Sequence, residues 1–366
     1  MKDIMTIPLF EAYPALEKQL PWMHLGNWPT PVQKLHNLGK AVGYENLWIK
    51  RDDLSSDIYG GNKVRKLEFA IADALRKKRK YMVTVGGIGT NHGLATTIYC
   101  GRAGIKTVLV LVPQPITDKV QENLLLDQHF GAEINVGRST AEAYLRAVWV
   151  LLAHPGFYLL WAGGTSPLST LGYVNAAFEL KRQIDAGLLP EPKYIFGATG
   201  SMGTTAGLIV GSRLAGLKSR IVGVKVSMGA YSNVRGIVSL ANKTAGLMRK
   251  HDPSVTDMRF TASDFDFETG FFGGEYGRVT PEGQAAVDLI KKAEGIRLET
   301  TYTGKALAAM LDFIKKGRSP DGAPILFWNT YNGVDYSETI KQCGGFSTLP
   351  KSAQWACKEN LIPYLK

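Results

Sequence analysis

A lysine that follows two glycines is the first candidate for chemistry in this chain. Gly60, Gly61 and Asn62 precede Lys63, and the sequence continues as Val-Arg-Lys-Leu-Glu. The glycines favour a sharp turn and Asn62 is a good N-cap, so a helix is expected to begin near Lys63. The positive end of the helix dipole and the nearby Lys66 would lower the pKa of the Lys63 amine. Such an amine suits imine formation with an aldehyde, although an ordinary exposed lysine at a helix start is the alternative.

A second loop has the composition of a phosphate-binding turn. It follows an apolar run at 194–197 and combines glycines with hydroxyl groups ahead of a predicted helix, so its backbone N–H groups could hold a phosphate. It lacks the lysine of a nucleotide P-loop, which disfavours ATP or GTP. The loop consists of Thr199, Gly200, Ser201, Met202, Gly203 and Thr204.

Two further segments carry polar groups that could contact a substrate. After the apolar run 81–85, the residues Thr90, Asn91 and His92 offer a hydroxyl, an amide and an imidazole for a carboxylate or a phenolate oxygen. A histidine after a strand is more often a structural hydrogen-bonding group than a catalyst, so Thr90 and Asn91 are the stronger candidates. A loop at 264–283 is rich in glycine and aromatic residues, among them Tyr276, which is unusual for a simple linker.

Composition and charge exclude several classes of partner. The chain has 366 residues with 43 Lys and Arg against 32 Asp and Glu, a net charge of +11. The densest basic run, 76–80, is best explained as a solvated helix end, and no zinc-finger or RNA-binding signature accompanies it. We therefore expect no nucleic-acid partner. Cys100, Cys343 and Cys357 are odd in number and share no C-x-x-C spacing, so neither a disulfide framework nor a metal site is expected.

The sequence also bears on localisation. The first twenty residues contain acidic side chains and lack the apolar core of a secretory signal. The most apolar region, 143–164, is interrupted by Arg146, His154 and Pro155, so it is not expected to span a membrane. We expect a cytoplasmic protein.

Short apolar runs that alternate with helical periodicity must position these groups. Strands separated by helices predict parallel sheets covered on both faces, and about eight strands in a chain of this length suit two sheets. Ligands in such folds lie beyond the carboxyl ends of the strands, where the loops above are found. The predicted strands are 47–50, 81–85, 107–112, 133–136, 157–161, 194–197, 221–226 and 325–328, and a helical face is predicted at 67–74.

In this order, the blocks resemble the D-cysteine desulfhydrase and 1-aminocyclopropane-1-carboxylate (ACC) deaminase family of fold-type II, tryptophan-synthase-β-like pyridoxal-phosphate enzymes. The resemblance extends over about residues 29–333, and the order and number of blocks make it specific. The matching blocks are Pro29-Thr30-Pro31-Val32, Lys50-Arg51-Asp52-Asp53, G-G-N-K-x-R-K-L-E, T-N-H at Thr90, T-G-S-x-G-T-x-A-G at Thr199, Tyr276-Gly277, Tyr302-Thr303-Gly304-Lys305-Ala306, and the strand 325–328.

The resemblance implies two open α/β domains with pyridoxal 5′-phosphate in the cleft, usually in a homodimer that binds a small amino acid. The expected bounds are 1–65 with 175–366 for the large cofactor-binding domain and 66–174 for the small domain. Lys63 would hold the cofactor as a Schiff base and later act as the general base. Further cofactor contacts are implied for Asn62, Lys66, Asn91, the six residues from Thr199 to Thr204, Thr303 and Thr330. Substrate contacts are implied for Thr90, Asn91, His92, Tyr276 and Tyr302, with Thr90 and the two tyrosines also expected to take part in catalysis.

Two positions bear on the substrate. ACC deaminases resemble Y-E-G-K and H-L-G-G at these places and desulfhydrases resemble Y-T-G-K and H-T-G-G, whereas this chain has Thr303 and Thr330. A carboxylate against the cofactor ring nitrogen sustains the electron sink needed to open a carbon ring, while loss of a thiolate needs less stabilisation. The resemblance therefore favours D-cysteine, with pyruvate, sulfide and ammonia as products. The departures at Thr90, Gly93 and residues 329–332 keep ACC, or another β-substituted amino acid such as cysteate, as alternatives.

Two alternatives come from other classes. A nicotinamide-dependent oxidoreductase could use the Gly200 loop for pyrophosphate, but it would leave the G-G-N-K turn and both tyrosine blocks without a role. A non-catalytic pyridoxal-phosphate-binding protein would hold the cofactor and form no product from any amino acid.

Overall fold

The chain folds into two compact α/β units. The computed structural model describes residues 6–320 and 322–365, so the first five residues of the segment judged for a secretory signal lie outside the described part. One unit comprises Met1–Phe69 and Ser166–Gly333, and the other comprises Ala70–Thr165 and Val334–Lys366. Each unit is built around its own sheet.

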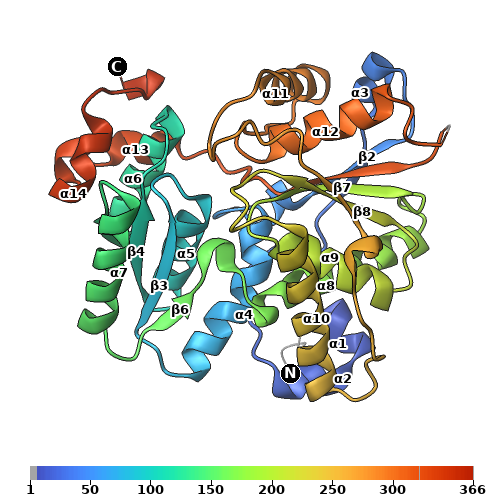
Figure 1. Ribbon diagram of the computed structural model, residues 1–366, viewed down its shortest axis with the longest axis horizontal. Helices are drawn as coiled ribbons and strands as arrows, with labels where there is room; N and C mark the ends of the chain where they lie inside the picture. The colour runs from blue at the N-terminus through green and yellow to red at the C-terminus, as the bar shows by residue number, and fades with distance from the viewer. Residues whose placement is uncertain (1–5, 321, 366) are drawn as a thin grey trace. The chain divides into compact units, whose positions relative to one another are not determined.

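The described elements alternate between strands and helices, as expected for α/β units (Figure 1). The strands are β1 (Val32–Lys34), β2 (Leu47–Arg51), β3 (Tyr81–Gly87), β4 (Lys106–Val112), β5 (Glu133–Val136), β6 (Tyr158–Leu160), β7 (Tyr194–Thr199), β8 (Arg220–Lys225), β9 (Asp266–Glu268) and β10 (Ile325–Asn329). The α-helices are α1 (Pro8–Ala12), α2 (Pro14–Gln19), α3 (His36–Val42), α4 (Asn62–Arg76), α5 (Asn91–Arg102), α6 (Asp118–His129), α7 (Thr140–Ala153), α8 (Pro167–Asp185), α9 (Gly203–Leu214), α10 (Val234–His251), α11 (Pro281–Glu294), α12 (Thr303–Lys315), α13 (Ser337–Gln342) and α14 (Lys351–Gln354).

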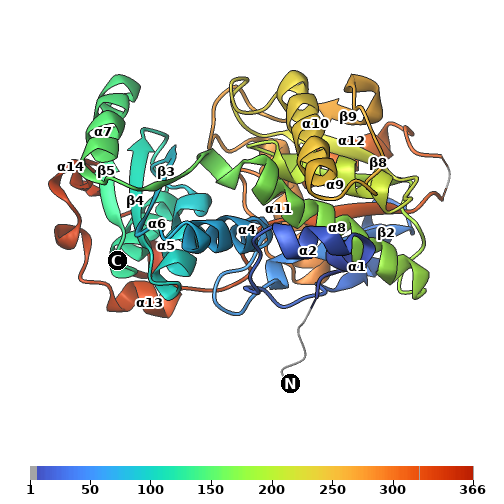
Figure 2. The same cartoon turned by 90° about the horizontal axis from the view of Figure 1, so that it is seen from below.

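The first unit contains a six-stranded sheet of order β1-β2-β10-β7-β8-β9, in which only β1 is antiparallel to its neighbour. Alternate residues of its strands enter two separate cores. Ile195 and Leu326 pack with α8, α9 and α10, whereas Phe196 and Phe327 pack with α11 and α12 on the opposite face. Both faces are buried, which explains why these strands are nearly continuous apolar runs. The short helices α1 and α2 join the core on the α8 side (Figure 2).

The second unit contains a fully parallel sheet of order β5-β4-β3-β6. Helix α7 covers one face through Val150, which packs on Val83, Val108 and Val110, and α5 and α6 lie on the other face (Figures 1 and 2). All eight predicted strands are present, within three residues of their predicted ends. Two three-residue strands, β1 and β9, were not predicted.

The domain bounds differ from the predicted ones mainly at the carboxyl end. The prediction places residues 334–366 in the large domain, but they cluster with the second unit. The buried side chain of Gln121 explains this, because its amide donates to the carbonyls of Ala356 and Glu359 at 3.0 and 2.7 Å and accepts from the Leu361 N–H at 2.9 Å. The junctions also shift, to a point inside α4 and to the start of α8.

A buried ion network ties together the elements that lead to the site. The Arg65 guanidinium, on α4, donates to Asp52 at 2.8 and 3.0 Å and to Glu179 of α8 at 3.0 Å. Lys50 also donates to Glu179, and the four side chains are at most 4% exposed. Burial would raise the pKa of Glu179, but the charges of Arg65 and Lys50 outweigh it and lower the pKa to about 2. Glu179 therefore stays ionised at neutral pH.

Removing one carboxylate from this network should destabilise the first unit. Glu179→Ala leaves two buried cations with a single acid, and we expect a loss of about 3–5 kcal/mol in the free energy of unfolding, measured by chemical denaturation. Because the folded pKa of Glu179 lies below its ordinary value of 4.5, its contribution is present at neutral pH and declines as the pH falls from 4.5 toward 2. Glu282→Ala, on the exposed side of α11, is the control. Equal losses in both variants would contradict the proposed role.

Candidate active site

The turn that precedes α4 is fixed by the loop after β10. Gly61 has φ +89° and approaches that loop so closely that a Cβ would lie 2.6 Å from the Thr330 carbonyl oxygen. The Asn62 N–H donates to the same carbonyl at 3.1 Å, and the Gly60 N–H donates to the side chain of Asn332 at 2.7 Å. The two loops join because β2 and β10 are parallel neighbours whose carboxyl ends lie at one edge of the sheet.

Lys63 lies in the first turn of α4, close to where the sequence predicts the helix to begin. Its amine donates to the Asn62 side-chain oxygen at 2.8 Å. Asn62 is the first helical residue, and its amide also donates to the Thr204 hydroxyl at 3.1 Å. Burial of the amine lowers the pKa of Lys63 to about 8, while the charge of Glu299 partly offsets this. The direction is the predicted one, but the main cause is desolvation and not the neighbouring Lys66.

The glycine-rich loop between β7 and α9 faces Lys66. A Cβ on Gly203 would lie 3.0 Å from the Lys66 amine, so a larger residue would require this amine to move by a few tenths of an ångström. Met202, at the N-cap of α9, has φ +68°, a left-handed conformation that is strained for a residue with a side chain. Lys66 is buried, and burial followed by the charge of Lys63 lowers its pKa. The N-terminus of α9, Gly203 and the Lys66 amine therefore lie around a common point.

The Thr199 side chain does not take the predicted place in this loop. Its hydroxyl lies 2.6 Å from that of Thr205, and the residue is 1% exposed. The Thr199 carbonyl accepts from the Ser232 hydroxyl at 2.6 Å. Thr199 therefore holds the loop to the core of the first unit, because its side chain, at the end of a buried strand, points into that core.

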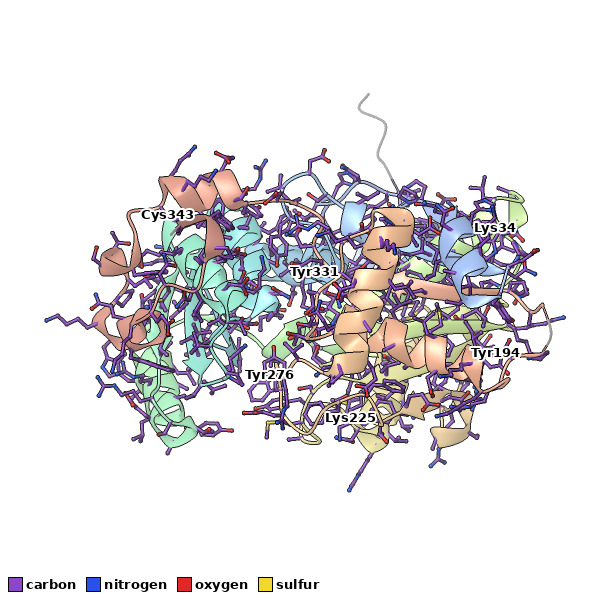
Figure 3. The ribbon with its side chains drawn as sticks, turned by 90° about the horizontal axis from the view of Figure 1, so that it is seen from above. Lys34, Tyr194, Lys225, Tyr276, Tyr331 and Cys343 are labelled. Atoms are coloured by element: carbon purple, nitrogen blue, oxygen red, sulfur yellow. The ribbon has the colours of Figure 1, made fainter. Side chains whose placement is uncertain are left out.

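Two tyrosines lie side by side in the first unit. The hydroxyls of Tyr276 and Tyr302 are hydrogen-bonded, and their rings meet edge to face with centroids 6.0 Å apart. Tyr276 is labelled in Figure 3. Burial is the main cause that raises the pKa of Tyr276 to about 12, and burial also raises the pKa of Tyr302 well above its ordinary value. A Cβ on Gly200 would lie 3.0 Å from the Tyr302 ring, so Tyr302 also borders the β7–α9 loop. Both tyrosines keep their protons at neutral pH.

The loop that carries Tyr276 is held by Lys305, a residue of α12. The buried Lys305 amine donates to the Phe272 carbonyl at 2.7 Å. The amine of Lys225, at the end of β8, lies 5.3 Å from the centre of the Phe272 ring (Figure 3). The Lys305 amine lies 5.6 Å from the same ring centre, so this aromatic side chain of the loop interacts with two lysines.

Sequence reasoning missed Glu299. Its side chain accepts hydrogen bonds from the N–H groups of Thr301, Tyr302 and Thr303 at 2.7–2.8 Å and from the Thr303 hydroxyl at 3.1 Å. It therefore caps the start of α12, where Thr303 is buried. The signal that could have found it is a glutamate three to four residues ahead of a predicted helix.

Thr90, Asn91 and His92 lie in the second unit, at the start of α5. The Thr90 hydroxyl caps the helix by accepting from the Gly93 N–H at 3.3 Å, and the Asn91 side-chain oxygen accepts from Asn123 at 3.1 Å. The His92 ring is buried, with its nitrogens 3.0 and 3.4 Å from the hydroxyls of Thr84 and Thr96. This geometry favours a structural part for His92 over the predicted substrate contact.

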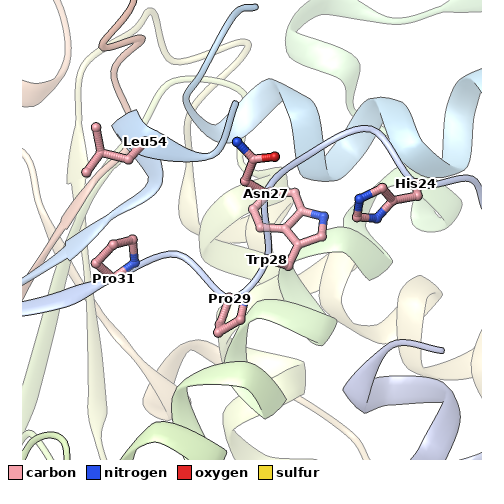
Figure 4. A pocket seen from close by; sticks show the side chains of 6 residues that line it. All are labelled: His24, Asn27, Trp28, Pro29, Pro31 and Leu54. Carbon is pink, nitrogen blue, oxygen red and sulfur yellow. The ribbon is translucent and has the colours of Figure 1, made fainter. Parts of the chain in front are cut away.

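A pocket of about 430 Å³ opens elsewhere in the first unit (Figure 4). Its lining includes none of the predicted site residues and consists of His24, Asn27, Trp28, Pro29, Pro31 and Leu54.

Within residues 6–320 and 322–365, no three His, Cys, Asp or Glu side chains are grouped to hold a metal ion, and the three cysteines are free. No helix in these ranges has both the length and the apolar character to cross a bilayer.

Comparison with known proteins identifies relatives over most of the chain. The model of a family described as pyridoxal-phosphate dependent enzyme matches residues 23–330. A protein named putative 1-aminocyclopropane-1-carboxylate deaminase from Pyrococcus furiosus is 34% identical, covering 86% of this chain and 93% of its own. A protein named D-cysteine desulfhydrase from Klebsiella pneumoniae is 33% identical, covering 85% and 94%.

Solved structures agree with these relatives. The crystal structure of an ACC deaminase homologue superimposes with a TM-score of 0.75 and 30% identity, covering 93% of this chain and all of that one. Threonine deaminase isoform 2 from Solanum lycopersicum shares the fold, with a TM-score of 0.58, 16% identity and coverage of 92% and 86%. The predicted fold class and cofactor are therefore confirmed. This chain belongs to the family of fold-type II pyridoxal-phosphate dependent enzymes whose members include proteins named D-cysteine desulfhydrase and ACC deaminase.

Proposed function

We propose that this enzyme converts D-cysteine and water into pyruvate, hydrogen sulfide and ammonia by α,β-elimination. The observation that carries the choice of substrate is the hydroxyl of Thr303, at the start of α12, where the sequences of ACC deaminases resemble Y-E-G-K and would place a carboxylate. The relatives named D-cysteine desulfhydrase, at 33% identity, support it.

The residues of the first unit fit pyridoxal phosphate. Lys63 would hold the cofactor, and the N–H groups of residues 200–204 at the start of α9, together with the Lys66 amine, would hold its phosphate. The fit rests on the approach of Lys66 to Gly203 and on the contact of Asn62 with Thr204. The lowered pKa of Lys63 favours the neutral amine that attacks an aldehyde, whereas a phosphate dianion beside Lys66 would favour the charged form of that amine against the effect of burial.

The protein contributes proton transfer and orientation. Bound pyridoxal phosphate supplies an electron sink that makes the α-proton of an amino acid acidic enough to remove. We assign that removal to the Lys63 amine, whose pKa of about 8 lets the neutral base exist near physiological pH. The Tyr276–Tyr302 pair, which stays protonated, would donate a hydrogen bond to the sulfur as the bond from Cβ breaks, and so stabilise the hydrosulfide anion that leaves and takes its second proton from water.

The substrate carboxylate is assigned to the N-terminus of α5. This twelve-residue helix begins with Asn91 and is capped by Thr90, so its first N–H groups offer a site for an anion. Thr90 and Asn91 remain the proposed contacts. His92 would act through Thr84 and Thr96 by fixing the turn, because its ring is already hydrogen-bonded to both.

ACC is the second candidate substrate. The Pyrococcus relatives carry the name putative ACC deaminase, at 34% and 31% identity. Asn332, at a position that departs from both branches, accepts from the Gly60 N–H and so supports the turn ahead of Lys63. Another β-substituted amino acid such as cysteate stays a further alternative. The family assignment leaves the nicotinamide alternative without support, and turnover would exclude a non-catalytic carrier.

We further propose that the enzyme is a cytoplasmic homodimer.

Replacing the cofactor lysine tests the activity. The purified protein should absorb as a yellow cofactor complex, and borohydride should bleach it and leave the label on Lys63. D-cysteine should yield equal amounts of pyruvate and sulfide. Lys63→Ala should lower turnover by about 10²- to 10⁴-fold, because the general base is lost.

Lys250→Ala, exposed at the end of α10, is the matched control and should retain full turnover. A label elsewhere than Lys63, or full activity of Lys63→Ala, would contradict the assignment of the lysine. A yellow protein that is inert to D-cysteine but releases ammonia from ACC would replace the proposed substrate and keep the site.

Cofactor uptake by the apoprotein should depend on pH. Below a pH of about 8 the Lys63 amine is mostly protonated and cannot attack the cofactor aldehyde, whereas above it the neutral amine dominates. The rate of absorbance change after addition of pyridoxal phosphate should therefore rise as the pH increases through about 8. A rate that rises only near pH 10 would show that burial does not depress the pKa of this amine.

A further inference from the structure

Glu299 is bonded to the residues that border the site through both its backbone and its side chain. Its carboxylate accepts from three successive N–H groups, those of residues 301–303. Its charge acts to raise the pKa of Lys63, Tyr276, Tyr302 and Lys305. One half-buried carboxylate thus fixes the Tyr302–Thr303 corner and sets the field felt by the lysine and the tyrosine pair.

The hydrogen bonds of the Thr303 hydroxyl determine whether it can donate or accept a further hydrogen bond. A hydroxyl has one proton to donate and two lone pairs to accept with. The Thr303 oxygen accepts from the Glu299 N–H at 3.1 Å, and its proton goes either to the Glu299 carboxylate at 3.1 Å or to the Glu299 carbonyl at 3.3 Å. In both cases Glu299 takes the proton. Only an acceptor position remains for any other partner.

We propose that Glu299 is a positioning residue that directs the Thr303 hydroxyl to accept, and not donate, a hydrogen bond toward the ring nitrogen of the cofactor. The inference rests on the proposed contact of Thr303 with the cofactor. A hydroxyl backed by a carboxylate favours a protonated ring nitrogen, since only the protonated nitrogen is a donor. The Glu299 charge would then act on the ring nitrogen only through a neutral hydroxyl, which holds the proton less firmly than a direct carboxylate contact and so remains in keeping with loss of a thiolate.

The protonation state of the ring nitrogen gives a direct test. In protein loaded with pyridoxal phosphate that is ¹⁵N-labelled in its ring, the nitrogen resonance should be that of a protonated ring. Glu299→Gln should move it toward the neutral value, and Glu282→Gln, exposed on α11, should not. In the apoprotein, pH-dependent acylation of Lys63 should show a pKa below about 8 in Glu299→Gln, because the charge that raises it is gone.

If Glu299→Gln does not fold, Thr303→Val tests the same contact with the ring nitrogen, and it should produce the same shift of the ring resonance. A neutral ring nitrogen in the unaltered protein, or an unchanged resonance in either variant, would overturn the proposal. The readout needs no turnover. A protein inert to D-cysteine with the expected resonances would therefore refute the proposed substrate and leave the part of Glu299 intact.

A different observation concerns helix α7 of the second unit. Five large apolar side chains on its outer side are 58–77% exposed, and at 100° per residue they occupy one continuous stripe. The inner side is apolar too, with Val150 in the core. A helix that is apolar on both sides is normally covered on both. The exposed residues, named here the α7 stripe, are Tyr144, Leu145, Val148, Trp149 and Leu152.

The α7 stripe suits a second copy of this chain. It offers on the order of 600 Å² of apolar and aromatic surface, against the roughly 800 Å² per partner of a standard interface. Two antiparallel α7 helices related by a two-fold axis near Val148 would bring Tyr144 of each against Leu152 of the other, which makes the stripe self-complementary. The stripe itself carries no cation, whereas a helix that binds a membrane surface has a basic polar face.

From this stripe we infer an isologous interface between two copies, independent of the catalytic proposal. The loaded full-length enzyme should have, by light scattering after size exclusion, twice the mass of the Val148→Glu/Leu152→Glu variant. Leu188→Glu, a matched change at an exposed leucine after α8, should leave the mass unchanged. Val148→Cys is a small change at an exposed position that should leave the fold intact, and it should form a disulfide-linked pair on oxidation.

An unchanged mass in the double variant together with no cross-linking of Val148→Cys would overturn this interface. Sedimentation of the unaltered enzyme with anionic lipid vesicles, abolished by the double variant, would also overturn it, because the stripe would then serve a membrane surface.

Discussion

The position of Lys63, the proposed cofactor lysine, depends on a buried ion network two residues further along the same helix. Arg65 is held by Asp52, which follows β2, and by Glu179 of α8, and its guanidinium lies 3.9 Å from the centre of the Trp28 ring. The Trp328 indole of β10 donates to Asp52 at 2.7 Å. Because water is excluded, these bonds are strong and a missing partner is costly. The first turn of α4 is thereby fixed to two strands and a second helix, and Lys63 with it.

The chemistry of the first unit follows from desolvation more than from charge pairs. Burial is the leading cause of the shifted pKa values of Lys63, Lys66 and Tyr276. It brings the two amines closer to neutrality and keeps the phenols protonated, so that one region holds both a base and proton donors near neutral pH. Glu299 moderates the effect, since its charge raises the pKa of Lys63 that burial lowers.

Most of the fold could be predicted because buried parallel strands leave continuous apolar runs. The strands β1 and β9 could not, since each has three half-buried residues at a sheet edge and too few positions to show a pattern. The loops of the site were found from their glycines and lysines. The bond between the Thr199 and Thr205 hydroxyls was not foreseen because the sequence does not show which hydroxyl points inward, and Glu299 was missed because its importance arises from three N–H groups that converge only in the folded turn.

The placement of Glu299 behind Thr303 has an evolutionary consequence. A residue that touches a cofactor is hard to exchange, because most replacements abolish all activities together. A residue behind it can be varied in small steps, and each step would alter how strongly the ring withdraws electrons while the surface seen by the substrate stays the same. Changes at position 299 could therefore adjust how readily the ring accepts electrons, while the hydroxyl at position 303 and the reaction it favours are kept.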